Sequence, residues 1–267
     1  MKALIPAAGR GTRMAALTGG SAKELYPLAG LPMIAHALRE LAAAGLSEVG
    51  VITSPVKGDL DRCLTGQAPP PGIAPQKAAE FARIIAPFEF AFFVQDEPRG
   101  LADALLEGAD WVDDDAFLLI LPDGVVVPPE TSLSPLLEAH RVSGDSVFAL
   151  IEVRREEAER YGNCGGVTLA GGDEPARRIL TLQEKGKGHF QVDGESALRT
   201  FPRQILSPRF FEIARDLHQT HLHGEFDDVP ILRMLVDEGG VLGQELTGRG
   251  FDVGNPVGHA AAEKALA

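Results

Sequence analysis

The amino-acid sequence predicts an α/β fold in which a mixed, mostly parallel sheet is flanked by helices. Four apolar runs in the first half have the length and composition of buried strands. They are Ala3–Pro6, Val49–Thr53, Phe90–Val94 and Phe117–Leu121. Helical patterns lie between these runs, at Met33–Ala44 and Leu101–Ala109. Strands that alternate with helices form βαβ units with right-handed crossovers, and such units build a parallel sheet.

The segment Met33–Ala44 is the best-defined helix of the first half. Ile34, Leu38 and Leu41 are spaced so that they share one face of a helix, and Gly45 follows as a stop signal. The proline-rich, polar stretch Gly66–Gln76 is expected to be a surface loop between elements, because it is too short to link two domains.

After about Thr131 the pattern becomes mixed. Strands are expected at Ser146–Val153, Gly166–Leu169, Ile179–Gln183, Val241–Leu246 and Gly250–Val253, and helices at Pro208–Leu217, at Val229–Val236 and from Pro256 onward. We therefore predict a single domain over residues 1–267. Its nucleotide-binding half would span about 1–130, and a half for a second substrate would span about 131–267.

Composition narrows the classes of function. The chain has 267 residues and a formal net charge of −13, and a field of this sign repels polyanions such as DNA or RNA. No run of about 18 apolar residues and no secretory signal is seen, so we expect a cytoplasmic protein without membrane contact. The two cysteines, Cys63 and Cys164, make no disulfide framework or zinc motif.

The loop "AAGRGTRM" directly follows the first expected strand and contains two glycines and two arginines. Rossmann dinucleotide sites require G-x-G-x-x-G, but Met14 occupies the third glycine position. A Walker loop requires Gly-Lys-Ser/Thr, which is missing. Glycines let backbone N–H groups approach phosphate oxygens, so the loop is either another kind of phosphate site or a glycine-rich turn with solvated cations.

Several segments together resemble the sugar-1-phosphate nucleotidylyltransferases, and most closely the bacterial UTP–glucose-1-phosphate uridylyltransferases. "GRGTRM" and "AKELYPLAGLPMI" are similar to the family's N-terminal signature, G-x-G-T-R-(about nine)-K-x-x-x-P. Further segments resemble later family motifs in the same order: "QDEPRGLADAL", "LLILPDGVV", "YGNCGGV", "LQEKGK", "RQILSP" and "GRGFDVGNPVGHAAA". The resemblance covers nearly the whole chain and implies the Rossmann-like nucleotide-diphospho-sugar transferase fold.

The implied reaction is transfer of a nucleotidyl group from an NTP to a hexose 1-phosphate, with release of pyrophosphate. UTP and glucose 1-phosphate are the substrates that the resemblance favours, and dTTP is the alternative nucleotide. The chain departs from the family pattern at Ala16, Ala22 and Gly186, where relatives have prolines, and in "DDVPIL", where they have a Thr-Asp pair. These departures leave the nucleotide and the sugar open.

The resemblance also implies roles for individual residues on the nucleotide side. Arg13 would hold the β- and γ-phosphates, and Lys23 would lie against the α-phosphate. Gln95 would pair with the nucleobase, with Gly100 beneath it. The remaining nucleotide-binding residues would be Ala7, Ala8, Gly9, Gly11 and Thr12.

On the sugar side, Lys185 would orient the attacking phosphate, Glu184 would accept hydrogen bonds from sugar hydroxyls and Gly162 would contact the sugar through its backbone. Asp123 and Asp252 would bind Mg²⁺, which favours carboxylate and phosphate oxygens. The alternatives are that the lysines are surface residues and that the two aspartates cap turns. The family forms homo-oligomers, so a dimer or tetramer is expected.

The sequence offers two further interpretations, a metal site at its histidines and a non-catalytic binding protein. His218, His221 and His223 have a spacing that suits a transition metal, but we expect a polar surface loop after a helix, with no acid or cysteine arranged around it. A non-catalytic sensor of sugar nucleotides on the same fold would not require Arg13, Lys23, Asp123, Lys185 and Asp252 together, so an enzyme is favoured.

Overall fold

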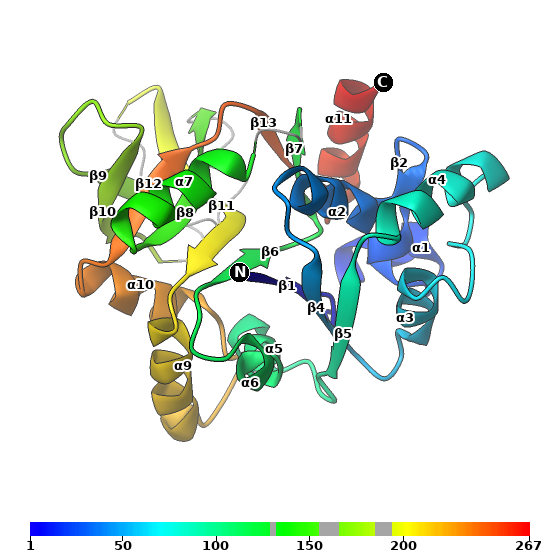
Figure 1. Ribbon diagram of the computed structural model, residues 1–267, viewed down its shortest axis with the longest axis horizontal. Coiled ribbons are helices and arrows are strands. Elements are labelled where there is room, and N and C mark those ends of the chain that lie inside the picture. Colours follow the sequence, from blue (N-terminus) through cyan, green and yellow to red (C-terminus); the bar gives the residue numbers. More distant parts are fainter. Residues whose placement is uncertain (129–131, 155–165, 185–193) are drawn as a thin grey trace.

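The computed structural model covers the whole chain and describes residues 1–128, 132–154, 166–184 and 194–267. A nine-stranded sheet crosses the molecule in the order β5-β4-β1-β6-β11-β8-β12-β10-β9 (Figure 1). The strands are β1 (Lys2–Pro6), β4 (Glu48–Thr53), β5 (Glu89–Val94), β6 (Phe117–Ile120), β8 (Ser146–Arg154), β9 (Val167–Leu169), β10 (Ala176–Leu182), β11 (Ser196–Leu206) and β12 (Val241–Glu245). Within this sheet β10 and β11 run opposite to the other strands, so the predicted mixed, mostly parallel sheet is confirmed.

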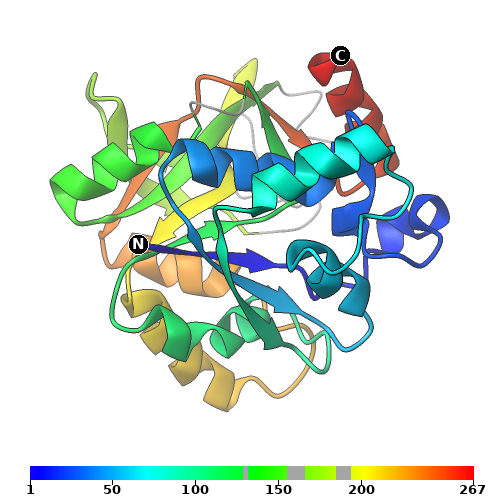
Figure 2. The same ribbon diagram turned by 45° about the vertical axis from the view of Figure 1, so that its right-hand side comes forward.

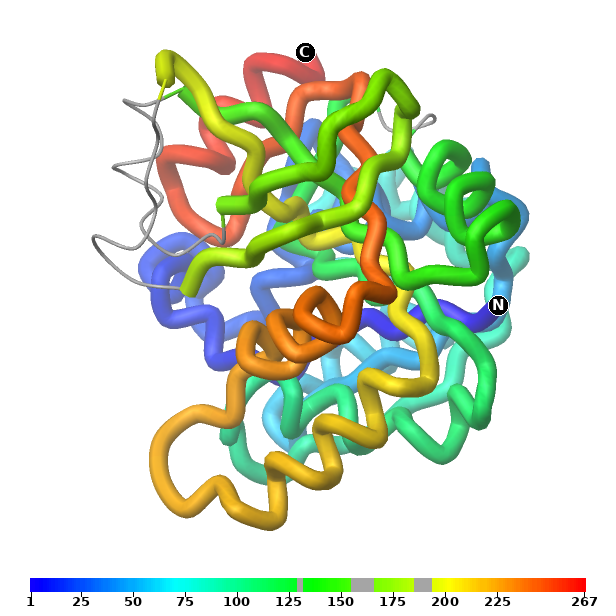
Figure 3. The backbone as a smooth tube through the Cα atoms, turned by 90° about the vertical axis from the view of Figure 1, so that its left-hand side faces the viewer, coloured from blue at the N-terminus to red at the C-terminus, as the bar shows by residue number. Residues whose placement is uncertain are grey.

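Helices cover both faces of the sheet (Figure 2). One face carries α2 (Met33–Ala43), α4 (Pro75–Ile85) and α7 (Ser134–Ser143), and the other carries α5 (Leu101–Glu107), α9 (Arg209–Thr220) and α10 (Val229–Asp237). In Figure 3 the neighbouring helices α9 and α10 lie beneath the sheet, far from the C-terminus. None of the helices in the described residues is both long and apolar enough to cross a membrane.

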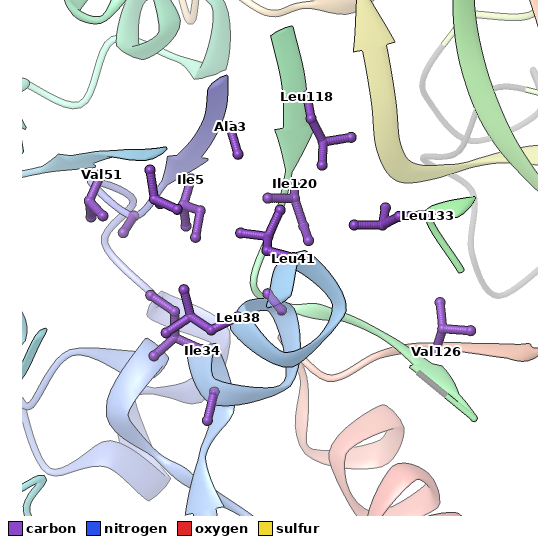
Figure 4. Packing of buried hydrophobic residues seen from close by; sticks show 14 of the residues in the cluster. Ala3, Ile5, Ile34, Leu38, Leu41, Val51, Leu118, Ile120, Val126 and Leu133 are labelled. Carbon is purple, nitrogen blue, oxygen red and sulfur yellow. The ribbon is translucent and has the colours of Figure 1, made fainter. Parts of the chain in front are cut away.

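The helix α2 buries the face that the sequence predicts. Ile34, Leu38 and Leu41 are fully buried and lie against β1 and β6, where they meet Ile5 and Ile120 (Figure 4). Their i, i+4, i+7 spacing places them on one stripe of the helix, which is why one side of α2 closes this core.

Two expectations about elements were wrong at their boundaries. The proline-rich stretch is not a loop throughout, because α4 begins at Pro75. Proline suits the first turn of a helix, where its missing N–H has no partner to lose. The helix expected at Leu101–Ala109 divides at Gly108 into α5 and α6 (Ala109–Val112). The sequence analysis also did not anticipate α3 (Gly58–Leu64) or α7.

A small two-stranded sheet joins the two halves of the chain. The strand β7 (Gly124–Val127) pairs antiparallel with β13 (Arg249–Asp252), and the C-terminal helix α11 (Pro256–Leu266) packs beside both. Buried apolar residues from the N-terminal segments, from β7 and from the C-terminal segments pack around this two-stranded sheet: Met14, Leu28, Met33, Val125, Phe251, Val253 and Ala262. The remaining short elements are α1 (Ala15–Thr18), the paired strands β2 (Pro27–Leu28) and β3 (Leu31–Pro32), and two single 3₁₀ turns, Thr12–Met14 and Lys23–Leu25.

A buried ion pair links α2 to β11. Arg203 donates from Nε to Glu40 Oε2 at 2.8 Å and from Nη2 to Glu40 Oε1 at 2.7 Å, and both side chains are 0% exposed. The same guanidinium donates to the backbone oxygens of Leu121 at 2.9 Å and Gly124 at 2.6 Å. Ser132 adds a hydrogen bond to Glu40 at 2.6 Å. The pair therefore fixes the turn that follows β6.

We expect Arg203→Met to lower the free energy of unfolding by about 3–5 kcal/mol, because it leaves the Glu40 carboxylate buried without its charge partner. The double variant Glu40→Leu/Arg203→Met should lose less than the sum of the two single losses. Urea denaturation measures each value. The control is Arg141→Met, since the Arg141–Glu138 pair is exposed and its loss should leave stability almost unchanged. Equal effects of Arg203→Met and Arg141→Met would contradict a structural role for the buried pair.

Candidate active site

The glycine-rich loop after β1 offers backbone N–H groups toward solvent. Ala7 is an exception, because its N–H donates to the Ile52 oxygen at 2.7 Å and is not available to a ligand. Within the described part of the chain, the N–H groups of residues 8–12 donate no backbone hydrogen bond. Gly11 has φ +61°, a left-handed conformation that favours glycine. These N–H groups, from Ala8 onward, make the loop a candidate for binding an anion.

Lys23 lies beneath this loop and points to the turn after β6. A Cβ at Gly11 would lie 3.5 Å from the carbon atoms of the Lys23 stem, so the loop packs directly on the lysine. The Lys23 ammonium donates to Asp123 Oδ2 at 2.5 Å, and each of the two side chains is 16% exposed. A cation from residue 23 and an acid from residue 123 are thereby joined below the loop.

A second lysine, Lys57, is buried and contacts both the start of the glycine-rich loop and the segment that carries Lys23. Lys57 Nζ donates to the Ala7 oxygen at 2.5 Å and to Glu24 Oε2 at 2.9 Å. Asp59 accepts a hydrogen bond from the Ala22 N–H at 3.3 Å. The start of α3 therefore fixes both the beginning of the glycine-rich loop and the segment that presents Lys23.

Asp123 and Asp252, 129 positions apart in sequence, lie side by side. Asp252 pairs with Gly124 in the two-stranded sheet of β7 and β13, and the Val253 N–H donates to the Asp123 backbone oxygen at 2.8 Å. Arg13 Nη1 lies 3.3 Å from Asp252 Oδ2. Two cations and two carboxylates from four separate parts of the chain thus form one cluster.

The ion pair between Lys23 and Asp123 keeps both groups charged at neutral pH. Burial by itself would lower the pKa of Lys23, but the Asp123 carboxylate raises it above its usual value. Burial would likewise raise the pKa of Asp123, but the Lys23 ammonium lowers it overall. The lysine is thus protonated and the aspartate is ionised across the neutral range.

The backbone after Asp252 approaches both carboxylates closely. A Cβ at Gly254 would lie 2.8 Å from Asp123 Oδ2, and one at Gly258 would lie 1.8 Å from the Asp252 backbone oxygen. Asn255 caps α11 by accepting from the Gly258 N–H at 2.9 Å, and it donates to the Asp252 oxygen at 3.0 Å. Glycine is required at these positions because the turn is packed against the cluster.

A cavity of about 1260 Å³ opens beside the cluster, and Arg13, Asp123 and Asp252 lie on its wall. Its other polar lining residues include Glu152, Arg199, Gln204 and Asp228, from β8, β11 and the start of α10. Its apolar lining residues are Leu101, Leu119, Leu121, Leu182, Val229 and Leu232, among others. The cavity wall thus carries charged, polar and apolar side chains together, so it can contact both the polar groups and the apolar faces of a small molecule.

Gln95 and Gly100, the predicted nucleobase residues, contact each other in the structure. Gln95 Nε2 donates to the Gly100 oxygen at 3.1 Å and to Asp103 Oδ2 at 2.8 Å. Gly100 has φ +125°, and a Cβ there would lie 2.3 Å from the Phe226 oxygen, so no other residue fits. Because both neighbours of Nε2 are acceptors, the amide nitrogen must face them and the amide oxygen must point away.

The histidine segment differs from the expected loop. His218 lies within α9, and its Nε2 is 3.2 Å from Asp103 Oδ1, so an acid does face it. His221 Nε2 lies 3.2 Å from the Gly224 oxygen. The described residues contain no group of three His, Cys, Asp or Glu side chains placed to hold a metal ion. His218 instead belongs to the hydrogen-bond chain that ends at Gln95.

The predicted sugar-side residues are placed in part. Gly162 and Lys185 lie outside the described residues, as does the neighbouring Tyr161. Glu184 is described, is exposed and accepts a hydrogen bond from Arg233 Nη1 at 2.5 Å. Arg233 belongs to α10, so the carboxylate of Glu184 is oriented toward that helix.

Comparison with known proteins places the chain in a family. A family model described as "Nucleotidyl transferase" matches residues 2–255. The chain belongs to the nucleotidyl transferase family. This nucleotidyltransferase is therefore an enzyme, as the resemblance of its motifs implies. The four clustered residues all lie in segments that resemble family motifs.

Similar proteins match this nucleotidyltransferase over nearly its full length. A UTP–glucose-1-phosphate uridylyltransferase of Pseudomonas aeruginosa is 30% identical over 98% of this chain and 94% of its own. One from Mycoplasma genitalium is 29% identical over 98% of this chain and 89% of its own. The solved structure of a UDP-glucose pyrophosphorylase complexed with UDP-glucose superposes with a TM-score of 0.82, at 25% identity, and covers 99% of this chain and 97% of that one. The expected fold is confirmed.

Sequence reasoning missed several residues that shape the site of this nucleotidyltransferase. Lys57 lies four residues after the end of β4, in the loop beyond the carboxyl end of a parallel strand, where ligand sites of such sheets form, and this signal was available. Arg203 gave no local signal, because its partner Glu40 lies 163 positions away. Asp103 contacts Gln95 eight positions before it, but its other partner, His218, lies 115 positions away.

We expect Gly258→Ala to lower the free energy of unfolding by at least about 1–3 kcal/mol, because the new methyl group has no room beside the Asp252 oxygen. Thermal unfolding checks this. Gly240→Ala is the matched control, since no described atom lies within 4 Å of a Cβ there, and its effect should stay within about 0.5 kcal/mol. Comparable stability of the two variants would show that the turn adjusts freely.

Proposed function

We propose that the protein transfers a uridylyl group from UTP to glucose 1-phosphate and releases pyrophosphate. The observation that carries this proposal is the cluster of Arg13, Lys23, Asp123 and Asp252 at one end of the large cavity. The names of relatives that align over nearly the whole chain support the choice of UTP and glucose 1-phosphate.

The reaction requires positioning and charge rather than a general base. An oxygen of the sugar phosphate attacks the α-phosphorus of the nucleotide and forms a new P–O bond. The bond from that phosphorus to the bridging oxygen breaks, and its electron pair leaves with pyrophosphate. The second pKa of a phosphate monoester lies near 6, so the attacking oxygen is already ionised at neutral pH. The main obstacle is repulsion between two anions, which preorganised cations reduce.

Each residue of the cluster has a distinct proposed role. The N–H groups from Ala8 to Thr12 bind the triphosphate, and Arg13 holds its outer phosphates. Lys23 lies beneath the loop and stabilises charge at the α-phosphate. From the family resemblance, Gly162, Glu184 and Lys185 contact the sugar phosphate.

Asp123 and Asp252 are proposed ligands of Mg²⁺. Proteins usually bind this ion through one or two carboxylates, and substrate phosphates and water complete its coordination. Two adjacent carboxylates fit this pattern. Among the described residues no third His, Cys, Asp or Glu side chain joins them, so coordination positions would be left for phosphate oxygens and water. When bound, Mg²⁺ offsets the negative charge of the phosphates.

The orientation of Gln95 supports a uracil or thymine base. Its amide nitrogen is directed to Gly100 and Asp103, so its oxygen is the atom left to meet a nucleobase. An acceptor oxygen matches the N3–H group of uracil or thymine and repels the N3 lone pair of cytosine. The contact does not distinguish UTP from dTTP, because the two bases differ by a methyl group elsewhere on the ring.

The proposal is tested by measuring pyrophosphate release for UTP, dTTP, CTP, ATP and GTP against a panel of hexose 1-phosphates with Mg²⁺. Release should require both substrates and should be fastest with UTP and glucose 1-phosphate. Lys23→Ala should lower kcat about 10²–10³-fold, the scale for losing one electrostatic stabiliser. The control is Lys77→Ala, a lysine on α4 whose partner is Glu80. No release from any pair, or a Lys23→Ala enzyme as fast as Lys77→Ala, would refute the assignment.

A Mg²⁺ titration of turnover tests the metal ligands. Asp123→Asn and Asp252→Asn should each weaken metal dependence, and activity should partly recover at high Mg²⁺. Because both residues act through one ion, the double variant should lose much less free energy than the two single losses added together. Asp110→Asn, at a fully exposed side chain, is the control. Strictly additive losses would mean that the two aspartates act separately.

Nucleotide choice tests the orientation of Gln95. Asp103→Asn replaces a charged acceptor by a neutral amide, which holds the Gln95 nitrogen less firmly. We expect the ratio of kcat/KM for UTP to that for CTP to fall about three- to tenfold. His218→Ala, which removes a group that contacts only the other oxygen of Asp103, should change the ratio less. An unchanged ratio in Asp103→Asn would show that Asp103 does not set base recognition.

A further inference from the structure

Gln204 is a buried amide on the wall of the large cavity. It belongs to β11 and is 5% exposed. Its Oε1 accepts no hydrogen bond from any described residue. Buried polar atoms in native proteins almost always have partners, so an amide left in this state calls for an explanation.

Gln204 lies on the cavity wall and is not one of the residues of the charged cluster. It pairs with Leu119 on β6 and with Phe148 on β8, next to a shift in register between β11 and β8. Asp123 follows Leu119 by four residues, a span of at most about 13 Å along the chain. Gln204 and the cluster are therefore close enough for one ligand in the cavity to contact both.

The chemistry around Gln204 matches a sugar ring. Leu119, Leu121, Leu182 and Leu232 line the same cavity and present apolar surface to the C–H faces of a ligand. An amide carries both donors and an acceptor, and a hydroxyl group can satisfy either. The dianionic phosphate group of a sugar phosphate only accepts hydrogen bonds, so it would leave Oε1 without a partner.

We propose that Gln204 binds hydroxyl groups of the acceptor sugar and contributes to the choice of sugar. This inference rests on the proposed function, which it deepens by naming a residue that reads the hydroxyl end of the acceptor. The unpartnered amide is retained because the ligand, and not the protein, completes its hydrogen bonds.

The test measures stability and binding on the same variants. Replacing Gln204 by an apolar side chain of similar size, as Gln204→Leu or Gln204→Met, removes a buried polar group that the protein itself leaves unsatisfied. The midpoint of thermal unfolding without ligand should therefore rise by about 2–4 °C. The dissociation constant for glucose 1-phosphate, measured by calorimetry, should increase about three- to tenfold. The dissociation constant for inorganic phosphate should not change.

The matched control is Gln244→Leu. Gln244 is also a buried amide, but it donates to the Glu245 oxygen at 3.1 Å and does not line the large cavity. This variant should lose stability and keep the affinity for glucose 1-phosphate. The combination of higher stability and weaker sugar binding is expected for the Gln204 variants alone.

Several outcomes would overturn the inference: unchanged affinity for glucose 1-phosphate in both Gln204 variants, a loss of stability like that of Gln244→Leu, or no binding of any hexose 1-phosphate by the wild type. Failure of the proposed function is a separate result. If the wild type binds glucose 1-phosphate through Gln204 but releases no pyrophosphate with any NTP, the reaction is refuted and the sugar contact stands.

Discussion

The buried contact between Arg203 and Glu40 is the constraint on which the site depends. Every N–H group of the guanidinium donates a hydrogen bond, to both Glu40 oxygens and to the backbone oxygens of Leu121, Pro202 and Gly124. Removing two charges from water is costly, so such a pair adds little net stability over a well-packed apolar substitute. Its effect is geometric. It ties α2 and β11 to the peptide groups on either side of Asp123 and allows the turn after β6 one conformation.

The arrangement of the cluster follows from that turn. With the turn fixed, the Asp123 side chain faces Lys23, and its backbone oxygen receives the Val253 N–H. The strand β7 begins directly after Asp123, and its pairing with β13 brings Asp252 beside Asp123. Lys57 constrains the opposite side through Glu24 and the Ala7 oxygen. The side chains of the cluster are thus held by buried ionic contacts on both sides, which suits the proposed catalysis by preorganised charge.

The sequence carries part of this arrangement and not the rest. The first four strands and α2 are confirmed because apolar runs and a helical stripe report burial locally. The motifs also named Asp123 and Asp252, which the fold brings together. Glu40 could not be recognised, since a charged residue on an amphipathic helix is usually solvated and nothing nearby points to Arg203. The contact of Asp103 with His218 could not be recognised either, because it joins two helices that lie far apart in the chain. Periodicity describes one element at a time, whereas these contacts depend on how distant elements meet.

The electrostatics of the cluster explain why an acidic protein can serve a polyanionic substrate and why a metal is part of the proposal. The net charge of −13 acts weakly beyond about 8 Å at physiological ionic strength, so nearby groups dominate at the site. Lys23 and Arg13 are the two cations of the cluster, but each already contacts a carboxylate. Two positive and two negative charges cancel. The cluster can therefore position phosphates precisely through directed N–H groups, yet it cannot neutralise a triphosphate and a sugar phosphate together. In the proposed function, Mg²⁺ would supply the additional positive charge, and the paired carboxylates would hold it.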